Sequence, residues 1–534
     1  MGLSKLFRRD GPTDGFVRTA DEQALVRRLD TFLLTFGCLS QVIKYLDQQN
    51  INNAYVSGMQ EDLNLHGNEL NLYGNKTPQP QLGEIATPAN GIYPRFTTYF
   101  NAAYCVMLIP SQIILTYIRP SIWLPGLEIV WGVLTGLIAM ASHARQIYVL
   151  RVFLGLCESS AWPGMMTLLM YWYTPTELAK RMGFYHSCQA VGQMMSGALQ
   201  AAISDTLDGH GGLAGWRWLF VINAIITVVW GFAGFFMIPD LPNRPNPRAF
   251  WFHKVHAELA MERLARNGRA EPKRMTWAGV KRTFSGWVVY FIAILYISTV
   301  LGTYGYVYFS LFLKSLKNPD GTPRWTVSEV NAIPIGGSAI NVVFVWIWAL
   351  LSDFLQTRWT LIVFQGIIGI IPCIIMSIWT SHPTAVPISG AYASYFIAYI
   401  CLGTAPLIFA WLADLIPQDP EARSLVVGVS VAGYYAISAW SQVLVWPASQ
   451  APFYKYGWQS ALALLVLVII MTCTLRWIDV RYLLRKREAF QATIEGEAVG
   501  RKDSVSPLAD RDHAQGPSSD PDRKSPHRAI VDEI

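Results

Sequence analysis

Two pairs of charged residues interrupt stretches of the sequence that are otherwise apolar. Arg151 and Glu158 lie in RVFLGLCESSAWPG, and Lys44 and Asp47 lie in QVIKYLDQQN. Ionisable groups are costly inside a membrane, where they face a partner or a water-filled cavity. In such a cavity a cation can receive an anionic substrate, and a carboxyl can take up and release a proton. The chemistry that these four residues favour is therefore coupled movement of protons and an anion.

Helical spacing indicates how these charges are arranged. Arg151 and Glu158 are seven residues apart, about two turns, so they share one helix face but lie too far apart for an ordinary pair. Each is therefore expected to find another partner. Lys44 and Asp47 are three residues apart, close enough to touch, and Gln48 lies about one turn beyond Lys44. A buried ion-pair network that fixes the packing of the two helices is the alternative interpretation.

Other polar and aromatic residues are candidates for the wall of a substrate cavity. His186 is followed on one helical face by Gln189 and Gln193, and it is either a hydrogen-bonded packing residue or a proton relay. No second His or Cys joins it at ligand spacing, so neither zinc nor haem is expected. Tyr304 and Tyr434 each belong to a tyrosine cluster that lines a cavity, packs in the core or lies in an interfacial belt.

The elements that must position these residues are membrane-spanning helices. Hydrophobic residues make up 52% of the 534 residues and charged residues only 15%, which argues against a soluble protein of this length. A span needs roughly 20 mostly apolar residues. Twelve segments meet this requirement, at 31–50, 96–118, 122–141, 147–172, 182–203, 217–239, 286–311, 329–351, 359–380, 387–412, 424–446 and 458–479. The predicted fold class is therefore all-α integral membrane.

Lysine and arginine residues gather in the segments before the first span, between the fourth and fifth, after the sixth and after the last. Such clusters mark the cytoplasmic side of a membrane protein. Both termini and the basic central segment are therefore predicted to be cytoplasmic. The net charge of +6 then reflects membrane topology rather than nucleic-acid binding. The basic segment is also compatible with binding to anionic lipid.

Sequence matches indicate an internal repeat. GWRW begins at Gly215 and GWQS begins at Gly457, a separation of 242 residues, and the arginines that precede the fifth and eleventh spans, Arg181 and Arg423, keep the same separation. Two bundles of six helices related in this way place their substrate site near the midplane between them. The predicted domains are a tail at 1–30, a first bundle at 31–239 with an extracellular loop at about 51–95, a linker at 240–285, a second bundle at 286–480 and a disordered tail at 481–534.

Motifs along the chain resemble a known family. RVFLG resembles the RxxxG motif on the fourth helix of the major facilitator superfamily, and its extension through Glu158 is similar to the RxxxGxxE pattern of the anion:cation symporter family. KYLDQQNINNAYVSGMQEDLNLHGNELN resembles the fungal allantoate and vitamin permease branch. NNAYVSGMQEDL, RPSIWLP followed by EIVWG, and SEVNAIP are similar to fungal pantothenate transporters. The resemblance implies the major facilitator fold.

The resemblance also implies roles for the charged residues. It assigns proton coupling to Asp47 and Glu158 and anion binding to Arg151. Many relatives have an Arg directly after the first-helix Asp, where this chain has Gln48, so Lys44 becomes a further candidate for the anion anchor. The predicted substrate-binding set is Arg151, Lys44, Gln48, His186, Gln189, Tyr304 and Tyr434.

The expected function is proton-coupled uptake of a small organic anion, with pantothenate favoured, by alternating access in the plasma membrane of a fungal cell. The expected protein is a monomer that uses the proton gradient without a cofactor and binds no nucleic acid. The alternatives are another carboxylate substrate (allantoate, nicotinate, biotin or a dipeptide) and a nutrient sensor that does not transport. An enzyme is not expected, because the sequence has no Ser/His/Asp set, phosphate loop or metal-ligand cluster.

The segment at 72–96 departs from the pattern of these relatives, which pass almost directly from the first span's loop to the second span. Asn75, Lys76 and Thr77 within it form an N-glycosylation sequon. Either the segment is an extracellular insertion that is glycosylated at Asn75, or it is a retained intron in the gene model.

Overall fold

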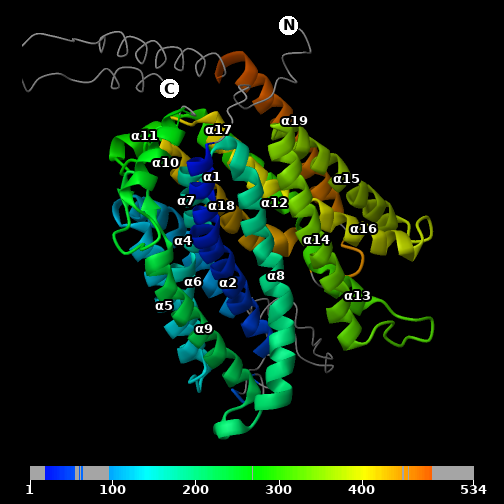
Figure 1. The fold of residues 1–534 in the computed structure, drawn as a ribbon. Helices are drawn as coiled ribbons and strands as arrows, with labels where there is room; N and C mark the ends of the chain where they lie inside the picture. Colours follow the sequence, from blue (N-terminus) through cyan, green and yellow to red (C-terminus); the bar gives the residue numbers. More distant parts are fainter. Residues whose placement is uncertain are drawn as a thin grey trace, which may run out of the picture.

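The fold is known from a computed structural model, which describes residues 19–54, 59, 62–63, 95–266, 269–447, 450–454 and 456–483. The described chain is almost entirely helical and forms an elongated bundle (Figure 1). Its first half contains α1 (Ala20–Leu29), α2 (Thr35–Ala54), α4 (Arg95–Tyr117), α5 (Pro120–Ile138), α6 (Ala144–Glu158), α7 (Ala161–Trp172), α8 (Pro175–Leu207) and α9 (Gly215–Met237). Its second half contains α12 (Trp287–Gly302), α13 (Phe309–Ser315), α14 (Val327–Leu355), α15 (Trp359–Ser381), α16 (Ile388–Ile400), α17 (Thr404–Leu415), α18 (Pro420–Val445) and α19 (Gly457–Ile478).

Within the described residues, nine helical segments are long and apolar enough to cross a membrane. They correspond to nine of the twelve predicted spans. The other three predicted spans are also helical, as α2, the α6–α7 pair and α8. These are the helices that carry the charged and amide candidates of the site, and their polar side chains lower the mean hydropathy. These polar side chains therefore distinguish α2, α6 and α8 from the more apolar spans of the bundle.

Three predicted spans are interrupted where the sequence analysis predicted continuous helices. The fourth breaks at Ser159 and Ser160 between α6 and α7, a few residues before Pro163, which restricts the backbone that precedes it. The tenth breaks at residues 401–403 between α16 and α17, and Gly403 is the N-cap of α17. The seventh ends as α12 and continues through a 3-10 turn at Tyr304–Tyr308 into α13. The fourth and tenth spans occupy equivalent places in the two halves, so the repeat extends to their breaks.

The first helix begins well inside the segment predicted to be an N-terminal tail. The Thr19 hydroxyl accepts a hydrogen bond from the backbone N–H of Glu22, a typical N-cap, and α1 then runs through a π-helical turn at Asp30–Leu34 into α2. Leu25 and Leu29 of α1 are fully buried. Residues 20–29 are therefore a packed helix. At the other end α2 continues to Ala54, past the predicted start of the extracellular loop.

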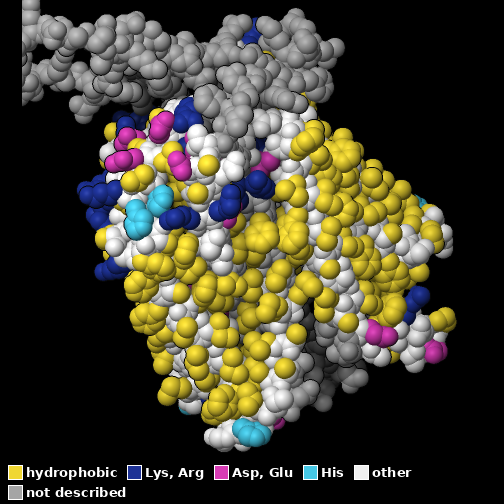
Figure 2. Space-filling view, in the orientation of Figure 1, with side chains coloured by type: hydrophobic (Ala, Val, Ile, Leu, Met, Phe, Trp, Pro, Cys, Tyr) yellow, Lys and Arg dark blue, Asp and Glu magenta, His cyan; other side chains and the backbone are white. Residues whose placement is uncertain are grey.

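The linker between the halves is ordered over most of its length. It contains a two-stranded antiparallel sheet of β1 (Asp240–Leu241) and β2 (Arg244–Pro245), in which Asp240 pairs with Pro245 and Leu241 with Arg244. The helices α10 (Lys254–Arg266) and α11 (Trp277–Ser285) follow. We call the end of the bundle that carries these elements the linker end. Lysine and arginine side chains gather there, and a broad hydrophobic surface covers the bundle beside it (Figure 2).

Glycines set the close approach of the helices that surround the site. A Cβ at Gly155 on α6 would collide with the backbone oxygen of Phe100 on α4, and a Cβ at Gly192 on α8 would lie 2.5 Å from the backbone oxygen of Val42 on α2. Helices α2, α4, α6 and α8 therefore pack with backbone close to backbone. This packing brings the charged residues of α2 and α6 toward the same interior.

Candidate functional site

A cavity of about 390 Å³ lies between the two halves of the chain. Its volume falls within the range of about 300–1,000 Å³ that is typical of small-molecule sites. Its polar and aromatic wall residues from the first half are Tyr45, Gln48, Gln49, Phe100, Asn101, Tyr104, Arg151, Trp162, His186, Gln189 and Gln193. Those from the second half are Tyr296, Thr299, Thr303, Tyr304, Tyr306, Asn341, Thr404, Tyr434, Tyr435 and Ser438.

Arg151 is the one cation among the described residues that line this cavity. Its side chain is 5% exposed, and the carbon of its guanidinium lies 5.2 Å from the centre of the Phe100 ring. It makes no hydrogen bond or ion pair with any residue that the structure describes, and its buried Nε is among the unpartnered atoms. A buried guanidinium is costly to leave unpaired, and its donors fit a carboxylate in a bidentate arrangement. The Arg151 guanidinium is therefore chemically suited to an anion in this cavity.

Glu158 lies behind this wall, on the same helix. Gln48 Nε2 on α2 donates a hydrogen bond of 2.9 Å to Glu158 Oε2, whereas Glu158 Oε1 is buried without a partner. The carboxyl also interacts electrostatically with Lys44 and Arg151. Both cations therefore interact electrostatically with Glu158, although neither lies within 4.0 Å of its carboxyl oxygens as an ion-pair partner.

The spacing of Lys44 and Asp47 would allow them to touch, but each has another hydrogen-bond partner. Lys44 Nζ donates a hydrogen bond of 2.9 Å to the hydroxyl of Tyr104 and lies 4.9 Å from the centre of that ring. Asp47 Oδ1 accepts a hydrogen bond from Asn223 on α9, so the two side chains of α2 point to different neighbours. Among the described residues, no salt bridge within 4.0 Å joins Lys44, Asp47, Arg151 or Glu158. The alternative of a closed ion-pair network therefore finds no direct contact in this geometry.

The remaining predicted residues lie on the cavity wall. His186 and Gln189 come from α8, Tyr304 follows α12, and Tyr434 comes from α18. The His186 ring lies 6.2 Å from the Trp162 ring, and its Nδ1 is buried without a hydrogen-bond partner. Gln48 also lines the cavity, whereas Lys44, Asp47 and Glu158 lie behind the wall. The predicted glycosylation residue, Asn75, lies outside the described residues.

Several residues of the site were not selected from the sequence. Tyr104 and Asn223 are the partners of Lys44 and Asp47, and Asn341 adds an amide to the cavity wall from the second half. Each is a polar residue with mostly apolar neighbours along its helix. Asn223 was the most predictable of the three from the sequence, because a buried amide in the middle of the apolar segment 217–239 needs a hydrogen-bond partner.

At the linker end the two halves are joined by direct contacts. Arg269 of the linker donates hydrogen bonds of 2.9 and 2.7 Å to the backbone oxygens of Met170 and Tyr173 in the first half, and it lies 3.4 Å from Asp414 in the second half. Burial lowers the pKa of the Arg269 guanidinium to about 10, against the effect of Asp414, so the group is charged at neutral pH. It therefore acts as a charged bridge between the halves.

Further contacts toward the same end join α8 of the first half to α14 and to the N-cap of α15 in the second half. The backbone N–H of Lys180 donates a hydrogen bond of 2.9 Å to Asp353, and Arg358 donates to the backbone oxygen of Pro175. Trp346 stacks on Phe184 with ring centres 5.4 Å apart, and its indole N–H donates a hydrogen bond of 2.8 Å to Ser187. The halves are therefore held together on the linker side of the cavity.

Comparison with known proteins places this arrangement in a family. Residues 37–431 match the family model of the Major Facilitator Superfamily. The chain belongs to this superfamily. It is a multi-pass membrane transporter and not an enzyme, and the predicted family and the fold class of twelve helices in two bundles are confirmed.

Relatives within the superfamily come from fungi. The chain is 33% identical to the MFS transporter PfmaC of Pestalotiopsis fici, over 85% of this chain and 79% of that protein. It is 28% identical to the pantothenate transporter liz1 of Schizosaccharomyces pombe, over 90% of this chain and 86% of that protein. It is 27% identical to the pantothenate transporter FEN2 of Saccharomyces cerevisiae, over 88% and 87%.

A solved structure of the superfamily has the same fold. The proton:xylose symporter XylE, bound to 6-bromo-6-deoxy-D-glucose, matches 88% of this chain and 99% of its own chain with a TM-score of 0.63 and 13% identity. At this identity the likeness supports the shared fold alone.

Proposed function

We propose that this transporter carries pantothenate into a fungal cell together with protons, by alternating access across the plasma membrane. In this proposal both termini and the linker are cytoplasmic, the protein acts as a monomer, and the proton gradient supplies the energy without a cofactor. The observation that carries the proposal is Arg151, a buried guanidinium with no hydrogen-bond partner among the described residues, on the wall of a cavity of about 390 Å³.

The cavity fits the chemistry of pantothenate. This molecule has one carboxylate, which suits the guanidinium of Arg151, and an amide and two hydroxyl groups, which suit neutral polar partners. Gln189, Gln193 and Asn341 supply such partners on the wall. Two relatives at 28% and 27% identity are named as pantothenate transporters, which supports this substrate. A relative at 25% identity is named as a vitamin H transporter, so biotin is the competing substrate to test.

Proton coupling follows from the electrostatic relation of Glu158 to the two cations. An ionised Glu158 attracts Arg151 and Lys44, and a neutral Glu158 leaves their charge available to an incoming anion. Binding of a proton at Glu158 and binding of the anion at Arg151 therefore favour each other. The loaded site has the same net charge as the empty site when one proton accompanies one anion.

Alternating access follows from the contacts at the linker end. Arg269, Lys180 and Arg358 join the halves there, so the cavity is closed toward the cytoplasm in the proposed orientation. Release of substrate into the cytoplasm requires these contacts to separate while the halves rock about the site. The proton and the anion thus leave together on the side where the linker lies.

The proposal is tested by uptake of labelled pantothenate in a yeast strain that lacks its own carrier. We expect uptake with this chain, loss of uptake with a protonophore, and strong loss in an R151A variant. The matched control is R145A, which removes an exposed arginine from the same helix and is expected to leave uptake unchanged. Uptake of biotin, allantoate or nicotinate without pantothenate would overturn the substrate, and no uptake of any of them by a surface-expressed chain would overturn the function.

A further inference from the structure

A third carboxyl group lies inside the first half of the chain, away from the substrate cavity. Glu128 on α5 is 2% exposed. Ser40 on α2 donates a hydrogen bond of 2.9 Å to its Oε2, whereas its Oε1 is buried without a partner. Neither the anion site nor the coupling at Glu158 uses this group. A buried polar atom without a partner calls for an explanation.

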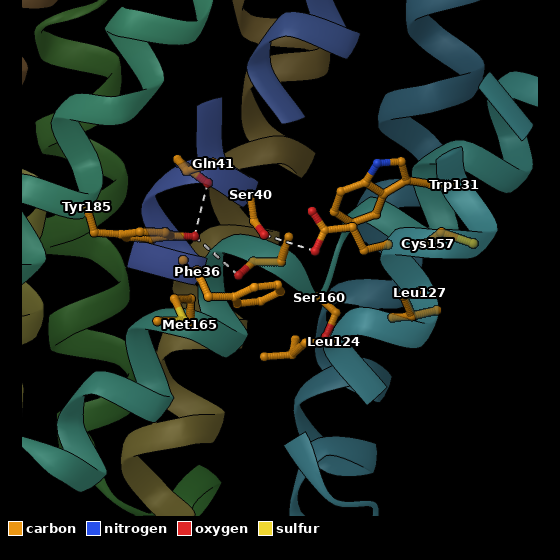
Figure 3. Close-up of a pocket in the computed structure, with 13 residues that line it drawn as sticks. Phe36, Ser40, Gln41, Leu124, Leu127, Trp131, Cys157, Ser160, Met165 and Tyr185 are labelled. Atoms are coloured by element: carbon orange, nitrogen blue, oxygen red, sulfur yellow. Dashed lines mark hydrogen bonds between the residues drawn. The ribbon is translucent and has the colours of Figure 1, made fainter. Parts of the chain in front are cut away.

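A small cavity of about 20 Å³ adjoins Glu128. Ser40, Gln41 and Tyr185 surround it (Figure 3), and Cys157 and Ser160 also contribute to its wall. The Tyr185 hydroxyl donates a hydrogen bond of 3.0 Å to Gln41 Oε1, which leaves the buried Gln41 Nε2 without a partner. A polar cavity of this volume has room for about one water molecule. Glu128 and Gln41 each provide an unused hydrogen-bonding atom for such a water.

The surroundings of Glu128 contain no cation that balances a negative charge. It forms no ion pair within the described residues, and the titratable groups that face it are Asp47 on α2, Cys157 on α6 and Tyr185 on α8. The helix α9, which also packs on α5, presents only neutral side chains such as Thr227 at this level. An ionised carboxyl without a cation is costly in an apolar interior. The neutral acid is therefore the stable form of Glu128 at rest.

Glu128 lies between Asp47 and the linker end. Ser40, its partner, precedes Asp47 by seven residues on α2, so the two share one helix face about 10 Å apart along the axis. Glu128 itself lies eight residues after Pro120, where α5 begins at the linker end. Asp47 and Glu128 also interact electrostatically. A path from Asp47 toward the linker end therefore passes Glu128.

We propose that Glu128 is a second proton-binding site, which receives the coupled proton from the Asp47 and Glu158 region on its way to the cytoplasm. In the transfer, an O–H bond breaks at the donor carboxyl, which becomes a carboxylate stabilised by Lys44 and Arg151. Because Glu128 is neutral at rest, its own O–H bond breaks first and that proton leaves toward the linker end. An O–H bond then forms again at Glu128 Oε1 by way of a water in the small cavity, which passes on the proton of the donor carboxyl. This inference rests on the proposed proton coupling.

The protonation of Glu128 is measured by infrared spectroscopy of the purified protein in lipid, which does not require transport. We expect the carboxylic-acid C=O band of the wild-type chain at neutral pH to lose one component in E128Q and to shift that component in S40A, which removes the hydrogen bond to Oε2. Identical spectra of the wild-type chain and E128Q would show that Glu128 is not a neutral acid and would overturn the inference.

The transfer role is measured by comparing accumulation along a pH gradient with counterflow exchange. We expect E128Q to lower accumulation relative to exchange by roughly tenfold or more, about 1.4 kcal/mol, and E128D, which keeps a carboxyl, to restore much of it. Unchanged accumulation in a folded E128Q variant, or equal loss of both activities, would overturn the relay. If the wild-type chain carries no substrate, the proposed function fails, and the infrared result still decides whether Glu128 holds a proton.

Discussion

Gln48 on α2 donates a hydrogen bond of 2.9 Å to Glu158 on α6. The hydrogen-bond partner of this carboxyl is therefore a neutral amide. The two cations nearby act on Glu158 only at longer range. A neutral partner binds the carboxylate without locking it in the ionised form, because an amide also accepts a hydrogen bond from the neutral acid. In the proposed mechanism, Gln48 therefore permits Glu158 to gain and lose a proton during the transport cycle.

Replacement of Gln48 by arginine tests this relationship. A guanidinium beside Glu158 stabilises the carboxylate, so Q48R is expected to shift the pH profile of uptake toward acid by about one unit, about 1.4 kcal/mol. The shorter amide in Q48N is the matched control and should leave the pH profile in place. The measurement is initial uptake of labelled substrate over a range of external pH. An unshifted profile in Q48R would show that Glu158 does not control the pH dependence.

Replacement of Glu158 by glutamine separates coupling from substrate movement. The amide keeps the shape of the side chain and removes the proton-binding group, so proton-driven accumulation is expected to fall to background while counterflow exchange largely persists. Both are measured with labelled substrate in vesicles. Loss of both together with poor surface expression would instead mark Glu158 as a residue that maintains the packing of α2 against α6.

The sequence alone predicted those parts of the structure that depend on local patterns. Apolar length predicted twelve spans, and the repeat placed Gly215 and Gly457 at equivalent helix starts, as α9 and α19. The isolated charges of the first and fourth spans led to Arg151 and Glu158, because a charge in an apolar helix is visible without knowledge of its neighbours. Tyr304 was likewise predicted from the sequence as a candidate for the cavity wall, and it lines the cavity.

The contacts between distant helices were not predictable in this way. Lys44 and Asp47 are neighbours on α2, yet their partners Tyr104 and Asn223 lie on α4 and α9, and packing of several helices decides which partner each side chain meets. Glu128 was not selected from the sequence, because its hydrogen-bond partner, Ser40, is 88 residues away along the chain. Helix breaks such as that at Ser159 were also missed, because hydropathy does not register them.

Removal of Arg269 is expected to loosen the linker end, which is cytoplasmic in the proposed orientation. Its charged hydrogen bonds to Met170 and Tyr173 are each worth roughly 1.5–3 kcal/mol, so R269A should favour the state that is open to the cytoplasm. The half-saturating external concentration for uptake should then rise about tenfold, because fewer molecules present an outward site. The matched control is R274A, an exposed arginine of the same linker. Equal half-saturation in R269A and the wild-type chain would contradict this role.

Replacement of Gly155 by alanine tests the close packing that positions Arg151. The added methyl group collides with the backbone of Phe100 on α4, so G155A should destabilise the fold by about 1–3 kcal/mol and lower the thermal midpoint of the purified protein. Gly126 is the matched control, because no atom lies within 4 Å of a Cβ added there. A midpoint in G155A as high as that in G126A would show that α4 and α6 can separate without cost.

The central claim, that a proton gradient drives a carboxylate vitamin through the Arg151 site, is tested most directly in liposomes that contain only the purified protein. Labelled pantothenate is added outside, and the interior is made alkaline relative to the exterior. The account predicts accumulation above the external concentration, collapse of this accumulation with a protonophore, and its absence in R151A. Equilibration of pantothenate to equal concentrations regardless of the pH gradient, or accumulation that persists in R151A, would contradict it.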